Sequence, residues 1–342
     1  MEIFMPMVRL AAALLATFAA LAPASAQDVK VRVAFVPVIG AAPLFVAAGS
    51  GDAKAAGLDI SLVRFDSGPP AIGAVASGTI DVLAIGIAPV AVARAKGLDV
   101  RIVAASSTGG SAFVASPLLA KSFEAAGGDP VRALADFRAR NIRPAKLATL
   151  PSGAVPNVAL NHWLFKLNAV KREDAQIVTL GIDAVQQSIL TGGVDGATVL
   201  EPSLTIVLQR DPALKAIVTA NEMFEAIPGV VVAVTGAFAT AHPEAVDKLV
   251  ALTARASALI ASDPLKAAGW SQNALGGGLI DAATLARALG SKAVTFVANP
   301  AAIEEPTRRM LAYQVELGDF EKAPPMDGLF DKAPYLRVSG GK

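Results

Sequence analysis

The sequence has no cysteine and only two histidines among its 342 residues. Without a thiol, the chain can form no disulfide, no thiolate metal site and no iron–sulfur cluster, and it has no cysteine nucleophile. A Ser/His/Asp triad would need His162 or His242. His162 lies beside Trp163 in a helix-like stretch and His242 directly precedes Pro243, so both are expected to be packing, capping or surface residues. Catalysis by histidine is therefore disfavoured.

Charged and aromatic residues are also scarce. Lys and Arg number 30 and Asp and Glu 29, which gives a formal net charge of +1. No dense basic tract interleaved with aromatic residues occurs, so nucleic-acid binding is disfavoured. The sequence is 54% hydrophobic but only 5% aromatic, a composition that suits helices packed on both faces of parallel sheets. The length favours two domains or two lobes.

Known catalytic and nucleotide-binding motifs are missing as well. The sequence contains no Gly-x-Ser-x-Gly elbow, no P-loop, no strand followed by Gly-x-Gly-x-x-Gly and no His-Glu-x-x-His. Its acidic residues lack the dense spacing of a calcium loop. We therefore predict neither a metal nor a cofactor. Asp81 and Asp195, which both precede an apolar run, are expected to have structural roles in turns.

The first 26 residues have the pattern of an export signal. Arg9 precedes the apolar stretch Leu10–Leu21, and Pro23-Ala24-Ser25-Ala26 supplies the small residues that a signal peptidase reads. The apolar stretch has twelve residues, fewer than the ~20 of a membrane-spanning helix. We predict cleavage after Ala26 and a periplasmic location.

Two parts of the mature chain are related by an offset of 114 residues. Gly78-Thr79-Ile80-Asp81 corresponds to Gly192-Gly193-Val194-Asp195, and Pro37 corresponds to Pro151. Each copy has an apolar run, a Pro-bearing loop, a second apolar run, a helix-like stretch, the Gly-x-(Ile/Val)-Asp motif and a third apolar run. This order predicts one α/β unit used twice, in two lobes that face each other across a cleft.

Short apolar runs bounded by Gly and Pro predict the strands. They span residues 29–36, 59–65, 82–85, 100–105, 146–150, 176–180, 197–200 and 230–234. Ser106–Ser111 and Ile227–Gly229 are polar or glycine-bearing links that predict two crossings between lobes. We therefore expect residues 27–109 to begin lobe 1 and residues 110–229 to form lobe 2. Residues 230–342 are expected to return to lobe 1 and add C-terminal helices on its outside.

Six of the predicted strands end in loops of small or polar residues that open helices. In an open parallel α/β sheet, ligands bind at the carboxyl ends of the strands, and helix N-termini there favour an anion. In any single loop, Gly and Ser could equally be turn formers. The loops contain no Arg or Lys, so apolar residues among them could hold an organic body. The candidate ligand-binding residues are Pro37, Ile39, Gly40, Ala41, Ser67, Gly68, Gly86, Ile87, Ser152, Gly153, Ala154, Asp183 and Glu201.

Six short motifs between residues 57 and 202 are informative together. They are Gly57-Leu58-Asp59-Ile60, Ser67-Gly68, Ala76-Ser77-Gly78-Thr79-Ile80-Asp81-Val82, Ala95-Lys96-Gly97-Leu98-Asp99-Val100, Gly192-Gly193-Val194-Asp195-Gly196-Ala197 and Glu201-Pro202. Over residues 29–260 the chain resembles the periplasmic substrate-binding proteins of ABC importers in the nitrate/sulfonate/taurine/bicarbonate group, which are similar in fold to the thiamine-pyrimidine precursor proteins.

The resemblance implies a type II periplasmic-binding-protein fold, with two α/β lobes that close on a solute by a hinge and deliver it to a membrane permease. It also implies that the loop 37–42, Ser67, Gly86-Ile87, Ser152-Gly153 and Glu201-Pro202 line the cleft. The chain departs from the usual sequence pattern of this family in two places, and both bear on which ligand it binds. Many relatives have Trp where this chain has Leu200, and the stretch Asp129–Arg143 differs from the compact segment usual before the lobe-2 strand.

The main interpretation is an exported, monomeric solute receptor. It would capture a small anionic or zwitterionic organic molecule and pass it to the transmembrane subunits of an ABC permease without chemistry. One alternative is a periplasmic enzyme that uses Asp183 or Glu201 as acid or base. Another is a sensor subunit that presents a surface to a membrane kinase. Glu201 itself could accept a hydrogen bond from a ligand ammonium group or hold the start of a helix.

Overall fold

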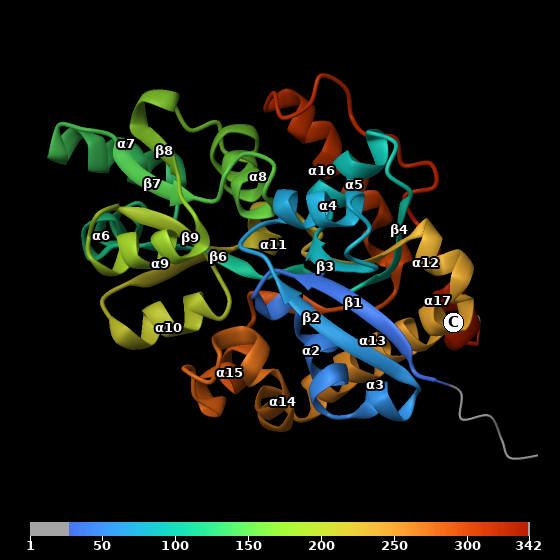
Figure 1. The fold of residues 1–342 in the computed structure, drawn as a ribbon. Helices are drawn as coiled ribbons and strands as arrows, with labels where there is room; N and C mark the ends of the chain where they lie inside the picture. Colours follow the sequence, from blue (N-terminus) through green and yellow to red (C-terminus); the bar gives the residue numbers. More distant parts are fainter. Residues whose placement is uncertain (1–26, 341–342) are drawn as a thin grey trace, which may run out of the picture.

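The computed structural model describes residues 27–340, which form two five-stranded sheets flanked by helices (Figure 1). We call each sheet, with the helices that cover it, a lobe. The predicted signal sequence and its cleavage after Ala26 lie outside the described residues. None of the helices within residues 27–340 has both the length and the apolar character needed to span a bilayer.

The sheet of the first lobe has the strand order β2-β1-β3-β11-β4. Its strands are β1 (Val29–Phe35), β2 (Leu58–Arg64), β3 (Val82–Gly86), β4 (Val100–Ala105) and β11 (Val230–Thr235). Strand β1 is parallel to β2 and β3, whereas β11 is antiparallel to β3 and β4. The central strands β3 and β11 are buried along almost their whole length, because helices cover both faces of the sheet.

The second lobe repeats this arrangement. Its strands are β6 (Ser111–Ala115), β7 (Ala145–Thr149), β8 (Ala175–Thr179), β9 (Gly196–Leu200) and β10 (Lys215–Thr219), in the order β10-β6-β9-β7-β8. Strand β7 is parallel to β8 and β9, and β6 is antiparallel to β9 and β10. Read from its other edge, this strand order is β8-β7-β9-β6-β10, which matches β2-β1-β3-β11-β4 strand for strand. The predicted duplication of one α/β unit is confirmed.

Helices connect the strands within each lobe. In the first lobe they are α2 (Ala42–Gly49), α3 (Asp52–Ala55), α4 (Gly68–Ala76) and α5 (Ile87–Ala95). In the second lobe they are α6 (Pro117–Ala125), α7 (Pro130–Asn141), α8 (Val155–Asn161), which continues as a π-helix over His162–Leu167, α9 (Ile182–Leu190), α10 (Ser203–Arg210) and α11 (Ala220–Met223). Several carry Pro in the first turn, where no backbone donor is needed.

Asp81 and Asp195 have matching structural roles. The Asp81 carboxylate accepts hydrogen bonds from the backbone N–H and the guanidinium of Arg32. The Asp195 carboxylate accepts from the backbone N–H of Lys146 and from the guanidinium of Arg143. Lys146 lies 114 residues after Arg32, so the backbone part of the contact is repeated at the same offset. Each aspartate ties the start of one strand to the strand beside it.

Two extended segments run side by side where the chain passes between the lobes. Strand β5 (Ser107–Gly109) leads from β4 to β6, and the returning segment lies next to it. The N–H of Gly109 donates to the Ile227 carbonyl at 2.9 Å, and the N–H of Gly229 donates to the Ser107 carbonyl at 2.9 Å. Strand β12 (Val294–Phe296) pairs with β5 on its other side. The predicted lobe boundaries, 109/110 and 229/230, lie in these two segments. That the chain moves as two bodies divided at these residues stays a prediction.

The C-terminal helices contact both lobes. They are α12 (Gly236–Ala241), α13 (Pro243–Ser262), α14 (Pro264–Gly276), α15 (Ala282–Leu289), α16 (Glu304–Glu316) and α17 (Ala333–Val338). Helices α13 and α14 pack on α2 of the first lobe, as expected, but α15 packs on α10 and α16 on α8 of the second. The sequence expectation missed these two contacts, because an amphipathic pattern identifies a buried face without identifying its partner.

Candidate functional site

A cavity of about 660 Å³ lies between the two lobes. Residues at or after the ends of β1, β2 and β3 line it from the first lobe, and the loops after β7 and β8, with Leu200 at the end of β9, line it from the second. Five of the six loops that the sequence singled out therefore line the cavity, and Glu201 after β9 does not. Because carboxyl ends of neighbouring parallel strands meet at one edge of a sheet, each lobe presents its loops to the same space.

Seven of the predicted ligand-binding residues line this cavity: Gly40, Ser67, Gly68, Gly86, Ser152, Gly153 and Ala154. Pro37, Ile39, Ala41, Ile87, Asp183 and Glu201 do not. Ile39, Ala41 and Ile87 are fully buried in the core instead. The short 3-10 helix over Ile39–Ala41 explains part of this, because it turns Val38 and Gly40 towards the cavity and their neighbours away from it.

The two segments that pass between the lobes, β5 and the returning chain, form one side of the cavity. Ser107, Gly109, Gly110, Gly229 and Val230 all line it. The hydroxyl of Ser107 accepts a hydrogen bond from the N–H of Val230 at 3.2 Å. A Cβ at Gly229 would lie 2.7 Å from that same hydroxyl oxygen, so no side chain fits there. The sequence identified these residues as a crossing but not as part of the site, since their place beneath the loops depends on tertiary structure.

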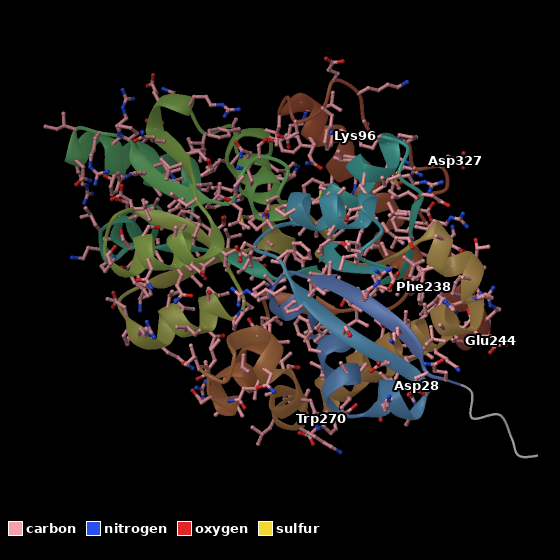
Figure 2. All side chains as sticks on the ribbon, viewed as in Figure 1. Asp28, Lys96, Phe238, Glu244, Trp270 and Asp327 are labelled. Atoms are coloured by element: carbon pink, nitrogen blue, oxygen red, sulfur yellow. The ribbon has the colours of Figure 1, made fainter. Side chains whose placement is uncertain are left out.

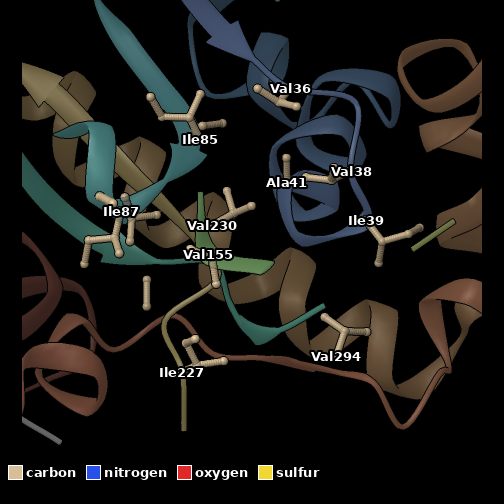
Figure 3. Packing of buried hydrophobic residues seen from close by; sticks show 14 of the residues in the cluster. Val36, Val38, Ile39, Ala41, Ile85, Ile87, Val155, Ile227, Val230 and Val294 are labelled. Atoms are coloured by element: carbon tan, nitrogen blue, oxygen red, sulfur yellow. The ribbon is translucent and has the colours of Figure 1, made fainter. Parts of the chain in front are cut away.

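The walls of the cavity are mainly aliphatic. Val36, Val38, Val230 and Val155 all line it, and Figure 3 shows Val230 beside Val155, which comes from α8 of the second lobe. A Cβ at Gly86 would lie 3.8 Å from a methyl group of Val155, so a single carbon added at Gly86 would come into van der Waals contact with the second lobe. Further lining residues missed at the sequence level include Ile72, Pro89, Val92 and Phe320. An apolar surface of this kind favours an organic ligand body over a small ion.

Only three charged side chains, Asp66, Lys96 and Asp319, are found among the described residues that line the cavity. Asp66 and Lys96 are exposed. Asp319 accepts hydrogen bonds from the hydroxyl of Ser152 and from the side-chain amide of Gln314, the latter at 3.1 Å. The strong positive charge that would neutralise a multiply charged anion is therefore missing from this set.

Four helices, α4, α5, α8 and α9, begin at the cavity. Their N-termini carry partial positive charge, which supports one anionic group. Proline in the first turns of α4, α5 and α8 reduces the number of N–H donors, because Pro69, Pro70, Pro89 and Pro156 have none. This arrangement is suited to a single weakly hydrated anionic group.

Glu201 is 2% exposed and lies behind the cavity rather than in its lining. Its two carboxylate oxygens accept hydrogen bonds from the N–H and the hydroxyl of Thr205, both at 3.1 Å. Burial raises the pKa of this carboxyl group, while hydrogen bonds from Ser291 and Thr205 act in the opposite direction. Of the two roles considered for Glu201, these contacts support holding the start of α10.

The two histidines occupy packed positions. The Nδ1 atom of His162 lies 2.8 Å from the Met223 carbonyl oxygen, and its ring packs against Phe224 and Tyr313. His242 packs against Phe238 at a ring distance of 5.3 Å. Within residues 27–340, no three His, Asp or Glu side chains come together in a way that could hold a metal ion.

A model of the NMT1-like family matches residues 24–272, which is most of the chain. The chain belongs to this family. The resemblance inferred from the six short motifs is thereby confirmed. A comparison with curated proteins gave no match.

Solved structures share the fold of this NMT1-like chain over most of their length. The periplasmic nitrate-binding protein NrtA from Synechocystis is 12% identical, with a TM-score of 0.75 over 92% of this chain and 89% of that one. The periplasmic aliphatic sulphonate binding protein SsuA from Escherichia coli is 17% identical, with a TM-score of 0.67 over 88% and 97%. The alkanesulfonate-binding protein SsuA from Xanthomonas axonopodis, bound to MOPS, is 16% identical, with a TM-score of 0.62 over 89% and 98%. The two-lobed periplasmic-binding-protein fold is confirmed.

Proposed function

We propose that this chain is the solute-binding component of an ABC-type importer, and that it captures an organic anion with a mainly apolar body in the periplasm. The observation that carries the proposal is the cavity between the lobes, lined by the ends of six strands and walled by aliphatic side chains. The relatives named for nitrate and sulphonates support an anionic group. The signal peptide would direct export and would then be cleaved after Ala26.

The size of the cavity supports a ligand larger than an inorganic ion. A volume of about 660 Å³ falls within the usual range for small-molecule sites. Nitrate or bicarbonate would leave most of this space unfilled. The lining follows α5 from Gly86 to Lys96, roughly 15 Å at the rise of an α-helix. An apolar body that covers part of this wall contributes about 25 cal/mol for each Å² removed from water.

Binding would couple to closure because the ligand contacts both lobes at once. A solute that touches both the β3 loop and the β7 loop interacts more strongly with the closed arrangement than with an open one. Only such differential affinity shifts the balance between the two. The closed form would then be the one presented to the permease.

A thermal-shift panel tests the ligand class. We expect the melting temperature to rise progressively from taurine through butanesulfonate to hexanesulfonate, and to rise with aromatic carboxylates. A probe present at a hundredfold its Kd stabilises by about 2.7 kcal/mol. Nitrate, bicarbonate and a thiamine pyrimidine precursor complete the panel, with sodium chloride at equal ionic strength as control. No shift with any probe at millimolar concentration would contradict the proposal, and a shift with nitrate alone would contradict the apolar body.

Native mass spectrometry of the purified mature protein separates this function from the alternatives. A retained ligand is expected at its unmodified mass and in a 1:1 ratio with a monomer. Recovery of a converted product would favour an enzyme, although neither Asp183 nor Glu201 lines the cavity. Capture of a permease from solubilised membranes supports the importer, whereas capture of a membrane kinase would favour a sensor.

A further inference from the structure

Asp319 and Phe320 form a third wall of the cavity, outside the two sets of strand-end loops. They follow α16 in the chain and lie beyond residue 272, where the match to the family model ends. Phe320 is the single aromatic side chain among the described residues that line the cavity. It is partly buried and packs on the core, so its position is constrained.

The helix that carries this wall is fastened to the second lobe. The rings of Tyr313 in α16 and His162 lie 5.1 Å apart, edge to face. Glu316 forms a salt bridge of 2.7 Å with Lys166. Figure 1 shows α16 between α8 of the second lobe and the helices α4 and α5 of the first. The wall therefore stands where the lobes meet.

Asp319 holds the loop after α16 in place through hydrogen bonds with Gln314 in α16 and with Ser152 in the second lobe. The chain turns sharply after α16 at Gly318, which has a positive φ of 79°. The N–H of Asp319 donates to the Gln314 carbonyl at 2.9 Å, and the buried Gln314 amide donates back to its carboxylate. The other carboxylate oxygen accepts from the hydroxyl of Ser152, which lies on the β7 loop of the second lobe.

Beyond the loop, the chain runs back to the first lobe past the end of α5. Figure 2 shows Lys96, at that end, and Asp327 on the same side of the molecule. Arg94 of α5 donates to the Asp327 carbonyl at 3.4 Å. The loop is thus anchored on the second lobe before Phe320 and on the first lobe after it.

We propose that Phe320 is a specificity-determining residue that presents its ring to a planar, unsaturated ring in the solute, and that Asp319 is the positioning residue that holds Phe320 against the cavity. This assignment rests on the proposed function, because it concerns the apolar body of the same ligand. Two aromatic rings in offset or edge-to-face contact gain attraction beyond the area that they bury. An aliphatic chain of equal carbon number gains none of it.

Calorimetry with benzenesulfonate and hexanesulfonate tests the assignment, since both probes carry six carbons and the same head group. The readout is the ring preference, defined as the Kd of hexanesulfonate divided by the Kd of benzenesulfonate. We expect Phe320→Leu to lower the ring preference about two- to tenfold. Phe330→Leu is the matched control, because Phe330 lies on the same tail but does not line the cavity, and it leaves the preference unchanged.

Asp319→Ala is expected to lower the ring preference as Phe320→Leu does, and the double variant lowers it no further, because the aspartate acts through the ring. Asp327→Ala is the control for the loss of a carboxylate on this tail. An equal loss of affinity for both probes in Asp319→Ala would remove its positioning role. An unchanged ring preference in Phe320→Leu would overturn the assignment while leaving the proposed function intact. If wild-type protein binds neither probe, both are wrong.

Discussion

The carboxyl group of Glu201 is buried where α10 begins, close to the crossing between the lobes. Among the described residues it forms no ion pair, and its carboxylate accepts hydrogen bonds from the Ser291 side chain and from the N–H and hydroxyl of Thr205, the two from Thr205 at 3.1 Å. Its backbone is tied to the crossing as well, since its N–H donates to the Gly110 carbonyl and its carbonyl accepts from the N–H of Ile39. A charged group in such a place is disfavoured, so burial raises the pKa of the carboxyl group.

This raised pKa predicts that Glu201→Gln gains stability relative to wild type as the pH rises. The ordinary pKa of a glutamate side chain, 4.5, describes the unfolded chain, and the pKa of Glu201 in the folded protein is higher. Between the two values the native state binds more protons than the unfolded state, so wild-type stability falls with rising pH until the native group also ionises. Glutamine does not titrate. Thermal scans from pH 4 to pH 8 should show the melting-temperature difference, variant minus wild type, increasing with pH.

The same substitution at the exposed Glu321 controls for the loss of one negative charge. A difference for Glu201→Gln that stays constant over this range would mean that the carboxyl group is ionised as easily in the folded protein as in the unfolded chain.

At the scale of the elements, much of each lobe could be predicted because its signals are local. The predicted strand 82–85 is β3 (Val82–Gly86), and the predicted stop at Gly78 has the positive φ, 72°, of a helix C-terminal glycine. The 114-residue offset extends to hydrogen bonds that no pattern shows. The N–H of Asp81 donates to the Arg32 carbonyl at 3.0 Å, and that of Asp195 donates to the Lys146 carbonyl at 2.8 Å.

These paired aspartates predict similar losses in both lobes. Asp81→Asn and Asp195→Asn each replace a carboxylate that accepts from a backbone N–H and an arginine, and each should cost about 1–2 kcal/mol at pH 7. Burial raises the pKa of Asp81, but hydrogen bonds from Arg32 outweigh it and lower the pKa overall. The stabilisation by Asp81 is therefore present above pH ~4 and is lost as the pH falls through the lowered folded value.

Urea unfolding at pH 7 and pH 3 measures the two losses. The gap between wild type and Asp81→Asn should narrow at pH 3. Asp59→Asn, on an exposed position of β2, is the control and should change stability by less than about 0.5 kcal/mol. A loss in one lobe only would indicate that the repeated hydrogen bonds do not have equivalent roles.

The elements that could not be predicted depend on contacts between distant parts of the chain. Asp319 meets Ser152, which is 167 residues away, and no local pattern indicates which loop a C-terminal helix will deliver to the site. Ile39 and Ile87 were predicted to contact ligand because they follow strands. Their full burial depends on how the first turn of each following helix is rotated, which sequence position alone does not determine.

At the scale of the whole molecule, the two lobes come near each other at Gly86 and Val155. Gly86 ends β3 of the first lobe, and Val155 begins α8 of the second. Strand β5 and the returning segment, which pass between the lobes, line the same cavity as Gly86 and Val155. The distance between Gly86 and Val155 therefore reports how far the lobes have closed. Gly86 has φ −58° and ψ 148°, a conformation that any residue can adopt. A larger side chain there changes the space between the lobes without straining the backbone.

Gly86→Leu is therefore expected to obstruct closure while leaving the fold stable. An added Cβ alone fits, at 3.8 Å from Val155, so Gly86→Ala should bind hexanesulfonate within about twofold of wild type. The further three carbons of leucine would occupy the cavity, and we expect binding to weaken tenfold or more, or about 1.4 kcal/mol. The melting temperature without ligand should stay close to that of wild type. Gly73→Leu, at an exposed position of α4 with no neighbour within 4 Å, is the matched control.

Small-angle scattering with saturating hexanesulfonate should give a larger radius of gyration for Gly86→Leu than for wild type, because the lobes cannot close past the side chain. Equal radii and equal affinities would show that the lobes do not come together at Gly86 and Val155 when ligand binds.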